Sequence, residues 1–182
     1  FCKCGIAQSK ILDIGKQRFT ESLQLGYQAD MHYLENNLSK RFNPEELLPD
    51  CKSVIVCLYN YLIDNKSDSK YKTARFTWIE DYHVIVKEML EKVVAKMQAA
   101  EPSLHCRVTV DSSCISEKNW AQETGVGCFG KNGLIHNERG SFFIIGTILA
   151  DFSCDNYDSP VRSDCGTCQI CVEKCPAKAL DI

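Results

Sequence analysis

Ser53 to Tyr61 reads SVIVCLYNY, and this stretch decides the fold that the sequence predicts. β-Branched and aromatic residues fill it without a break, which is typical of a strand buried in a sheet. Two other stretches have the same character, HCRVTVD from His105 to Asp111 and SFFIIGTILAD from Ser141 to Asp151. The apolar start from Phe1 to Ala7 and the short run from Gly133 to His136 predict further extended segments.

Helical patterns lie between these strands. The longest helix is expected from about Ile79 to Ala99, where apolar residues recur every three or four positions. Shorter helices are expected over Gln17 to Leu25, over Asp30 to Leu38, from a typical helix start at Asn43, and over Ile115 to Thr124. Gly26 and Gly125 follow two of these helices as C-terminal caps, and Ile63 to Thr73 is polar enough to be a surface loop. The pattern predicts an α/β (α+β) fold, a mixed sheet with flanking helices.

The composition describes an ordinary globular chain. The 182 residues are 45% hydrophobic and 25% charged, which leaves room for one full domain and part of another. There is no apolar run long enough to span a bilayer and no secretory signal. The net charge is −3 and no basic stripe offers a strong footprint for nucleic acid. Because the chain begins at Phe1 and ends shortly after Pro176, we expect a fragment of a longer protein.

A cysteine run, CGTCQICVEKCP from Cys165 to Pro176, lies close to the end of the chain. Its spacing, C-x2-C-x2-C-x3-C-P, is the one with which bacterial ferredoxins hold iron–sulfur clusters. The pattern predicts Cys165, Cys168 and Cys171 as ligands of one 4Fe-4S cluster and Cys175 as a ligand of a second. Structural zinc usually takes two separated cysteine pairs. The other eight cysteines are scattered, and we interpret them as buried thiols in a reducing compartment.

A glycine-rich loop, GVGCFGKN from Gly125 to Asn132, matches two phosphate motifs by letter. Neither has its context, because G-x-G-x-x-G must follow a strand and G-x4-G-K must continue with Ser or Thr. The loop is therefore either a turn between a helix and a strand, or a main chain that approaches another large cofactor. Asp111, at the end of a predicted strand, is a candidate general acid and equally a candidate turn residue.

Several stretches occur together in an order that resembles the epoxyqueuosine reductase family, the cobalamin-dependent iron–sulfur enzymes of tRNA queuosine synthesis. They are Arg41 to Pro49, SVIVCLYNY, Ala74 to Phe76 with Asp81 to His83, Val110 to Ser113, Glu117, GVGCFGKNGLI, Gly140 to Phe143 and the cysteine run. The resemblance runs from about Gly5 to the last residue, and it is to the N-terminal part of such an enzyme.

The resemblance implies a cobalamin-binding α/β domain over residues 1–155 and a truncated ferredoxin-type 4Fe-4S segment over residues 156–182. It implies that Asp111 is the catalytic proton donor. The residues that match the family's cobalamin contacts are Arg41, Lys131, Gly133, Leu134, Ile135, Ser141 and Ile145. A carboxyl that donates a proton near neutral pH needs desolvation, which a corrinoid packed against it would provide.

The reaction that the resemblance implies is the reduction of epoxyqueuosine to queuosine in tRNA, with cobalamin and 4Fe-4S clusters as cofactors. The tRNA would be held mainly by a C-terminal part that this chain lacks, so the fragment alone could be inactive. We expect a cytoplasmic monomer without membrane contact, with an electron donor that the sequence does not identify. Two alternatives stay open: another corrinoid iron–sulfur reductase, for example a dehalogenase-like one, and a non-enzymatic ferredoxin-like electron-transfer module.

Overall fold

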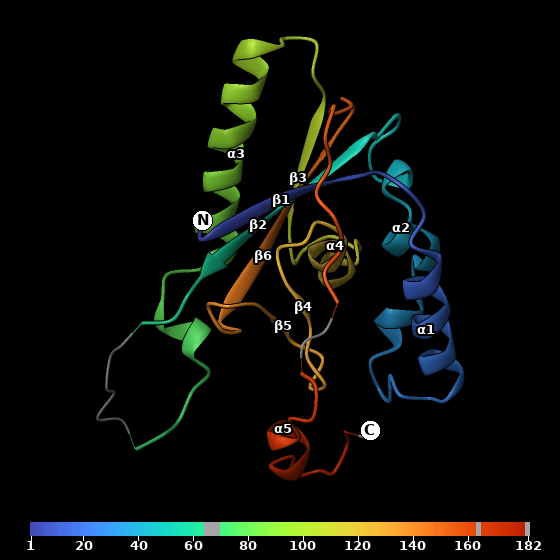
Figure 1. The fold of residues 1–182 in the computed structure, drawn as a ribbon, viewed down its shortest axis with the longest axis vertical. Helices are drawn as coiled ribbons and strands as arrows, with labels where there is room; N and C mark the ends of the chain where they lie inside the picture. The colour runs from blue at the N-terminus through green and yellow to red at the C-terminus, as the bar shows by residue number, and fades with distance from the viewer. Residues whose placement is uncertain (64–69, 163–164, 181–182) are drawn as a thin grey trace.

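The computed structural model describes residues 1–63, 70–162 and 165–180 (Figure 1). Its main sheet has four strands in the order β1-β2-β6-β3, and every neighbouring pair is antiparallel. The strands are β1 (Lys3–Gln8), β2 (Ser53–Asn60), β3 (Cys106–Val110) and β6 (Phe143–Ala150), and a separate hairpin is formed by β4 (Cys128–Phe129) and β5 (Ile135–His136).

Helices flank this sheet, which confirms the predicted α+β class. They are α1 (Asp13–Gln24), α2 (Leu38–Phe42), α3 (Tyr82–Ala100), α4 (Glu117–Glu123) and α5 (Ile170–Glu173), with short 3-10 turns at His32–Glu35, Pro44–Glu46 and Arg75–Trp78. The expected mixed sheet is wrong in its detail. The pairs β1–β2, β2–β6 and β6–β3 all run antiparallel, because the connections bring each strand beside one of opposite direction. The sheet therefore contains no parallel pair among the residues described.

The two faces of the sheet are covered by different helices because side chains alternate along each strand. In β2, Val54, Val56 and Leu58 belong to the cluster that contains the fully buried Trp120 of α4. Cys57 belongs to a second cluster, with Val86 and Leu90 of α3. Helices α1 and α2 lie on the side of the sheet away from α3 (Figure 1).

Glycines let helices α3 and α4 approach the sheet closely, one on each face. A Cβ at Gly146 in β6 would lie 2.7 Å from Leu90 Cδ1 of α3. A Cβ at Gly5 in β1 would lie 2.1 Å from the carbonyl oxygen of Thr124, just after α4. Neither position could hold a larger residue without moving main chain or core, so these two glycines set the spacing of the layers.

One predicted helix is wrong. From Asp30 to Leu38 the chain forms a 3-10 turn at His32–Glu35, and α2 begins only at Leu38. The reason is the pair of asparagines between them: Asn36 is extended, and Asn37 has a left-handed φ of +55°. A left-handed residue interrupts the helical hydrogen bonds, and asparagine tolerates that conformation better than most residues.

The helix expected from Asn43 is also wrong, because the chain forms only a 3-10 turn at Pro44–Glu46 after the Asn43 cap. The remaining predicted strands and helices are confirmed, with shifted ends. The helix expected from Ile79 begins at Tyr82, after the cap residue Asp81, and the cap glycines Gly26 and Gly125 have φ values of +73° and +68°. The predicted loop from Ile63 to Thr73 falls largely on residues 64–69, which lie outside the described residues. Across the ranges that the structure describes, no helix combines the length and the apolar character needed to cross a membrane.

Candidate functional site

Asp111 follows directly after β3, at a sharp bend of the main chain. Its φ is +53°, a left-handed conformation that is uncommon outside glycine. The backbone N–H of Ser112 donates to the carbonyl oxygen of Val110, 2.5 Å away, which closes a three-residue turn. The backbone N–H of Asp111 donates to Glu117 Oε1 at 2.8 Å. The Glu117 side chain on α4 therefore holds the bend in place.

The carboxyl of Asp111 is held by the start of α3. The hydroxyl of Tyr82 donates to Asp111 Oδ2 at 2.8 Å, and His83 Nε2 lies 3.7 Å from the same oxygen. The Tyr82 ring stacks on His83 with centroids 4.1 Å apart. Burial, together with the bond to Asp111, raises the pKa of Tyr82 to about 12. Tyr82 is therefore a hydrogen-bond donor at every physiological pH.

His83 connects two carboxyl groups. Its Nδ1 lies 2.8 Å from Asp81 Oδ1, and its backbone N–H donates to that oxygen at 2.9 Å. These two bonds lower the pKa of Asp81. From the sequence alone, the helical spacing of Tyr82 within the apolar stripe indicates core packing, and His83 is interpreted as a residue that forms a local hydrogen bond. The structure shows the local bond, and it adds the contact between Tyr82 and Asp111, which helical periodicity alone does not reveal.

Glu117 is a second carboxyl at the same place. It is partly buried, and burial raises its pKa to about 7, with repulsion by Asp111 acting in the same direction. Near neutral pH it is therefore a mixture of carboxylic acid and carboxylate. An acid whose pKa is shifted toward neutrality by burial beside a partner charge is typical of functional sites, although ion networks can cause the same shift.

Asp111 and Glu117 line a pocket of about 430 Å³. Most of its wall is apolar or aromatic, and it also includes Tyr82 and the ammonium-bearing Lys118. The remaining lining residues are Tyr61, Phe76, Leu134, Phe143, Ile144 and Ile145. Leu134 and Phe76 are 46% and 41% exposed, which is high for large apolar side chains. This combination of an apolar wall and a few convergent polar groups is typical of a ligand site.

The structure brings only part of the predicted cobalamin set to this pocket. Leu134 and Ile145 line it, together with Asp111. Gly133 is adjacent, since its carbonyl oxygen accepts a hydrogen bond from Lys118 Nζ at 3.0 Å. Ile135 is a buried core residue of β5, and Ser141 is partly exposed and is not among the lining residues. Tyr61, Phe76 and Lys118 line the pocket without having been singled out from the sequence.

The other two predicted contacts lie elsewhere. Lys131 Nζ donates to the carbonyl oxygens of Gly166 and Cys168, at 3.0 and 2.9 Å, so it binds the main chain of the cysteine run. Arg41 lies at the end of α2, where its guanidinium donates to the Tyr33 carbonyl oxygen. Its Nε is buried and has no hydrogen-bond partner among the described residues. A buried donor without a partner is uncommon in folded proteins.

The cysteine run folds into a turn followed by α5. The backbone N–H of Cys168 donates to the Cys165 carbonyl oxygen at 2.9 Å, and Cys165 Sγ lies 3.7 Å from His136 Nε2 in β5. None of the twelve cysteines is in a disulfide. Within the described ranges, no three His, Cys, Asp or Glu side chains converge in a way that could hold a metal ion. Thiols are the ligands that iron–sulfur clusters require, and the prediction of a cluster here depends mainly on the spacing of the four cysteines in the sequence.

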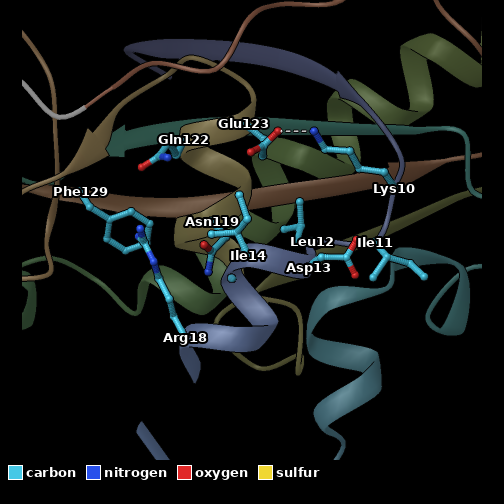
Figure 2. Close-up of a pocket in the computed structure, with 11 residues that line it drawn as sticks. Lys10, Ile11, Leu12, Asp13, Ile14, Arg18, Asn119, Gln122, Glu123 and Phe129 are labelled. Carbon is cyan, nitrogen blue, oxygen red and sulfur yellow. Dashed lines mark ion pairs between the residues drawn. The ribbon is translucent and has the colours of Figure 1, made fainter. Parts of the chain in front are cut away.

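A second pocket, of about 320 Å³, lies between the start of α1 and α4 (Figure 2). Figure 2 shows Lys10 paired with Glu123, with Asp13, Arg18 and Phe129 around the same space. Lys10 Nζ lies 2.6 Å from Glu123 Oε2. Its charges are of both signs, and none of the predicted site residues lines it. We therefore take the Asp111 pocket as the candidate site.

Fold and site together define an α+β domain with a carboxyl-bearing apolar pocket and an adjoining cysteine run. The comparisons with known proteins point to one family. A family model described as epoxyqueuosine reductase QueG, DUF1730, matches residues 41–112. Epoxyqueuosine reductase from Leadbetterella byssophila is 34% identical over 97% of this chain and 59% of its own length. The enzyme from Synechocystis is 36% identical over 92% of the chain and 58% of its own length.

Solved structures of epoxyqueuosine reductases have the same fold as this chain. A selenomethionine-labelled epoxyqueuosine reductase matches with a TM-score of 0.88 and 26% identity, over 98% of this chain and 49% of that one. A second structure, of the reductase with an epoxyqueuosine-modified tRNA-Tyr stem loop, matches with a TM-score of 0.87. These matches confirm the resemblance: over nearly its whole length the chain is similar to part of the epoxyqueuosine reductases. It spans somewhat more than half the length of the curated relatives.

Proposed function

We propose that the chain forms the catalytic part of an epoxyqueuosine reductase, which reduces epoxyqueuosine to queuosine in tRNA in the cytoplasm. The cofactors would be cobalamin, bound within residues 1–155, and 4Fe-4S clusters, bound by residues 156–182. The observation that carries the proposal is the carboxyl of Asp111 in the lining of a largely apolar pocket. A Bacillus subtilis epoxyqueuosine reductase, 25% identical with a TM-score of 0.85, is described with its catalytic aspartate loop swung out of the active site. That description supports the same role for the bend at Asp111.

The reaction sets clear chemical requirements. Converting an epoxide into an alkene consumes two electrons and two protons, and the oxygen leaves as water. Cobalamin, when bound, would supply a reduced metal centre that attacks carbon, and the clusters would supply single electrons. The protein has to hold the substrate, exclude water and deliver protons to the departing oxygen.

Asp111 suits the delivery of a proton. Tyr82 and His83 both contact Oδ2 and so restrict the rotation of the carboxyl, while Glu117 fixes the main chain. The Asp111 side chain is 64% exposed in the protein alone. The desolvation that a general acid needs must therefore come from the molecules that cover the pocket. Glu117, which is partly protonated near neutral pH, lies close enough to serve as a second proton store.

The remaining residues fit the cofactors as follows. Leu134 and Ile145 present an apolar wall that suits the face of a large ring. Arg41 lies outside the pocket and remains a proposed contact on the strength of the family resemblance. Gly133, Ile135 and Ser141 remain proposed contacts on the strength of the family resemblance. Cys165, Cys168, Cys171 and Cys175 would bind the clusters, and Lys131 would hold the loop that carries the first of them.

The test of this proposal uses one substitution and two readouts. Asp111→Asn should keep cobalamin binding, followed as a change in the ultraviolet–visible spectrum, and should lose the conversion of epoxyqueuosine in a modified tRNA stem loop, followed by nucleoside mass spectrometry. The control Asp155→Asn changes an exposed aspartate away from the pocket and should alter neither readout. Turnover that survives Asp111→Asn would refute the catalytic assignment. No spectral change with the unaltered protein would refute the cofactor and favour the electron-transfer alternative.

A further inference from the structure

Two cysteines outside the candidate site face each other across the sheet. Cys4 in β1 is the register partner of Cys57 in β2, so the two residues lie directly opposite on antiparallel strands. Both side chains point to the face of the sheet that carries α3, because Cys57 belongs to the cluster around Val86 and Leu90. Cys57 is 2% exposed, whereas Cys4 is exposed on the outermost strand of the sheet order.

The backbone geometry of such a pair is compatible with a disulfide. Cα atoms of directly opposite residues in antiparallel strands are about 4.5 to 5.5 Å apart. Disulfides join Cα atoms that are about 4.4 to 6.8 Å apart. Two opposite cysteines can therefore be bridged by rotation of the side chains and a small approach of the strands, with the ladder of β1 and β2 kept.

The two thiols are also chemically different. The interaction with the Cys57 side chain opposite it lowers the pKa of Cys4 to about 7. The same contact, together with burial, raises the pKa of Cys57 far above its usual range. An exposed sulfur that is about half thiolate at pH 7 is the better nucleophile, and a protected thiol beside it can displace a group that becomes bound there.

We propose that Cys4 and Cys57 form a reversible redox site, in which Cys4 reacts with a low-molecular-weight disulfide such as glutathione disulfide and Cys57 then closes a Cys4–Cys57 disulfide. In the first step the Cys4 thiolate attacks one sulfur of the disulfide, and one glutathione leaves as thiolate. In the second step Cys57 loses its proton and attacks Cys4, and the second glutathione leaves. The two protein thiols are oxidised by two electrons, and one glutathione disulfide is reduced to two glutathione molecules.

Alkylation kinetics provide a comparison within the molecule. Burial raises the pKa of Cys106 in β3 to about 11. At pH 7 the thiolate fraction of Cys4 is then several thousand times that of Cys106, and the lower nucleophilicity of the more acidic thiolate offsets part of this advantage. Cys4 should therefore react with iodoacetamide about 100-fold faster than Cys106, and its rate should rise as the pH passes through 7 and then level off.

The decisive experiment is peptide mapping after oxidation. The protein is incubated with glutathione disulfide, quenched in acid, alkylated and digested, and the linked peptides are identified by mass spectrometry. We expect a Cys4–Cys57 linked peptide in the unaltered protein and a persistent Cys4–glutathione adduct in Cys57→Val. In Cys4→Ser, which changes an exposed position and so spares the core, Cys57 should stay reduced.

Three results would overturn the proposal. They are a Cys4 that stays reduced while other cysteines oxidise, an adduct on Cys4 that never passes to Cys57 in the unaltered protein, and a Cys57 that oxidises equally in Cys4→Ser. None of these readouts depends on cobalamin, an iron–sulfur cluster or tRNA. The redox site and the proposed reductase activity can therefore fail independently.

Discussion

Replacing Glu117 by glutamine is expected to remove a pH dependence from the stability of the fold. The pKa of Glu117 is raised from 4.5 to about 7, chiefly by burial. Between these two values the folded protein keeps a proton that the unfolded chain has released. The stabilisation is therefore complete below about pH 4.5 and is lost as the pH rises through 7.

The magnitude follows from the two pKa values. Each pKa unit corresponds to about 1.4 kcal/mol, so the loss on deprotonation is on the order of 3 kcal/mol. Glutamine is neutral at every pH, and it keeps a side-chain oxygen that can accept the backbone N–H of Asp111. Glu117→Gln should therefore match the unaltered protein near pH 4.5 and exceed its stability by up to about 3 kcal/mol above pH 8.

Urea unfolding between about pH 5 and pH 8 measures this difference. The control is Glu88→Gln, which removes an exposed carboxylate from the outer side of α3 and should leave the pH dependence unchanged. A stability difference between Glu117→Gln and the unaltered protein that stays constant over this range would refute the reasoning. It would mean that the Glu117 carboxyl is solvated well enough to ionise as it does in the unfolded chain.

Three further predictions test the packing and the cysteine run. Leu90→Ala removes a fully buried side chain beside Gly146 and should lower the free energy of unfolding by about 3 to 5 kcal/mol, measured by urea titration. A loss below about 1 kcal/mol would contradict the central position of Leu90 in the packing between α3 and the sheet. Gly5→Ala places a methyl group 2.1 Å from the Thr124 carbonyl oxygen and should lower the melting temperature, and an unchanged value would mean that α4 is less tightly seated on β1. Lys131→Ala removes both hydrogen bonds to the cysteine run and should speed amide hydrogen exchange in that run, with exchange in the sheet unchanged. The same exchange rates in the variant and the unaltered protein would show that Lys131 does not hold the cysteine run in place.

Most of the fold could be predicted because its signals are local. The β-branched run of β2 specifies a buried strand wherever it is placed, and Gly26 and Gly125 mark helix ends because their left-handed φ values exclude most other residues. The stretch from Asp30 to Leu38 misled the prediction because its apolar spacing is helical while Asn37 takes a left-handed conformation. Strand direction was also beyond local signals, since it depends on which strands the connections bring together.

The site was predictable only in part, for a related reason. Asp111 could be singled out because it ends a strand next to a glycine-rich loop. One of its partners, Tyr82 at the start of α3, lies 29 residues earlier in the chain, and the other, Glu117, lies six residues later on α4. Tyr82 stands in an apolar helical stripe, so periodicity assigns it to the core, and nothing in its spacing indicates that its hydroxyl reaches Asp111. Such contacts are tertiary, and they appear only when the layers are assembled.

The hairpin of β4 and β5 links the pocket to the cysteine run. On the pocket side, Leu134 lines the wall and Lys118 bonds to the carbonyl oxygen of Gly133. On the other side, Lys131 bonds to two carbonyl oxygens of the cysteine run, and His136 lies 3.7 Å from Cys165 Sγ. The glycine-rich loop that resembles a phosphate motif thus has a different physical role, because it connects the proposed place of proton delivery with the proposed place of electron entry. For a reaction that needs both, a short and well-bonded connector keeps the two at a fixed separation.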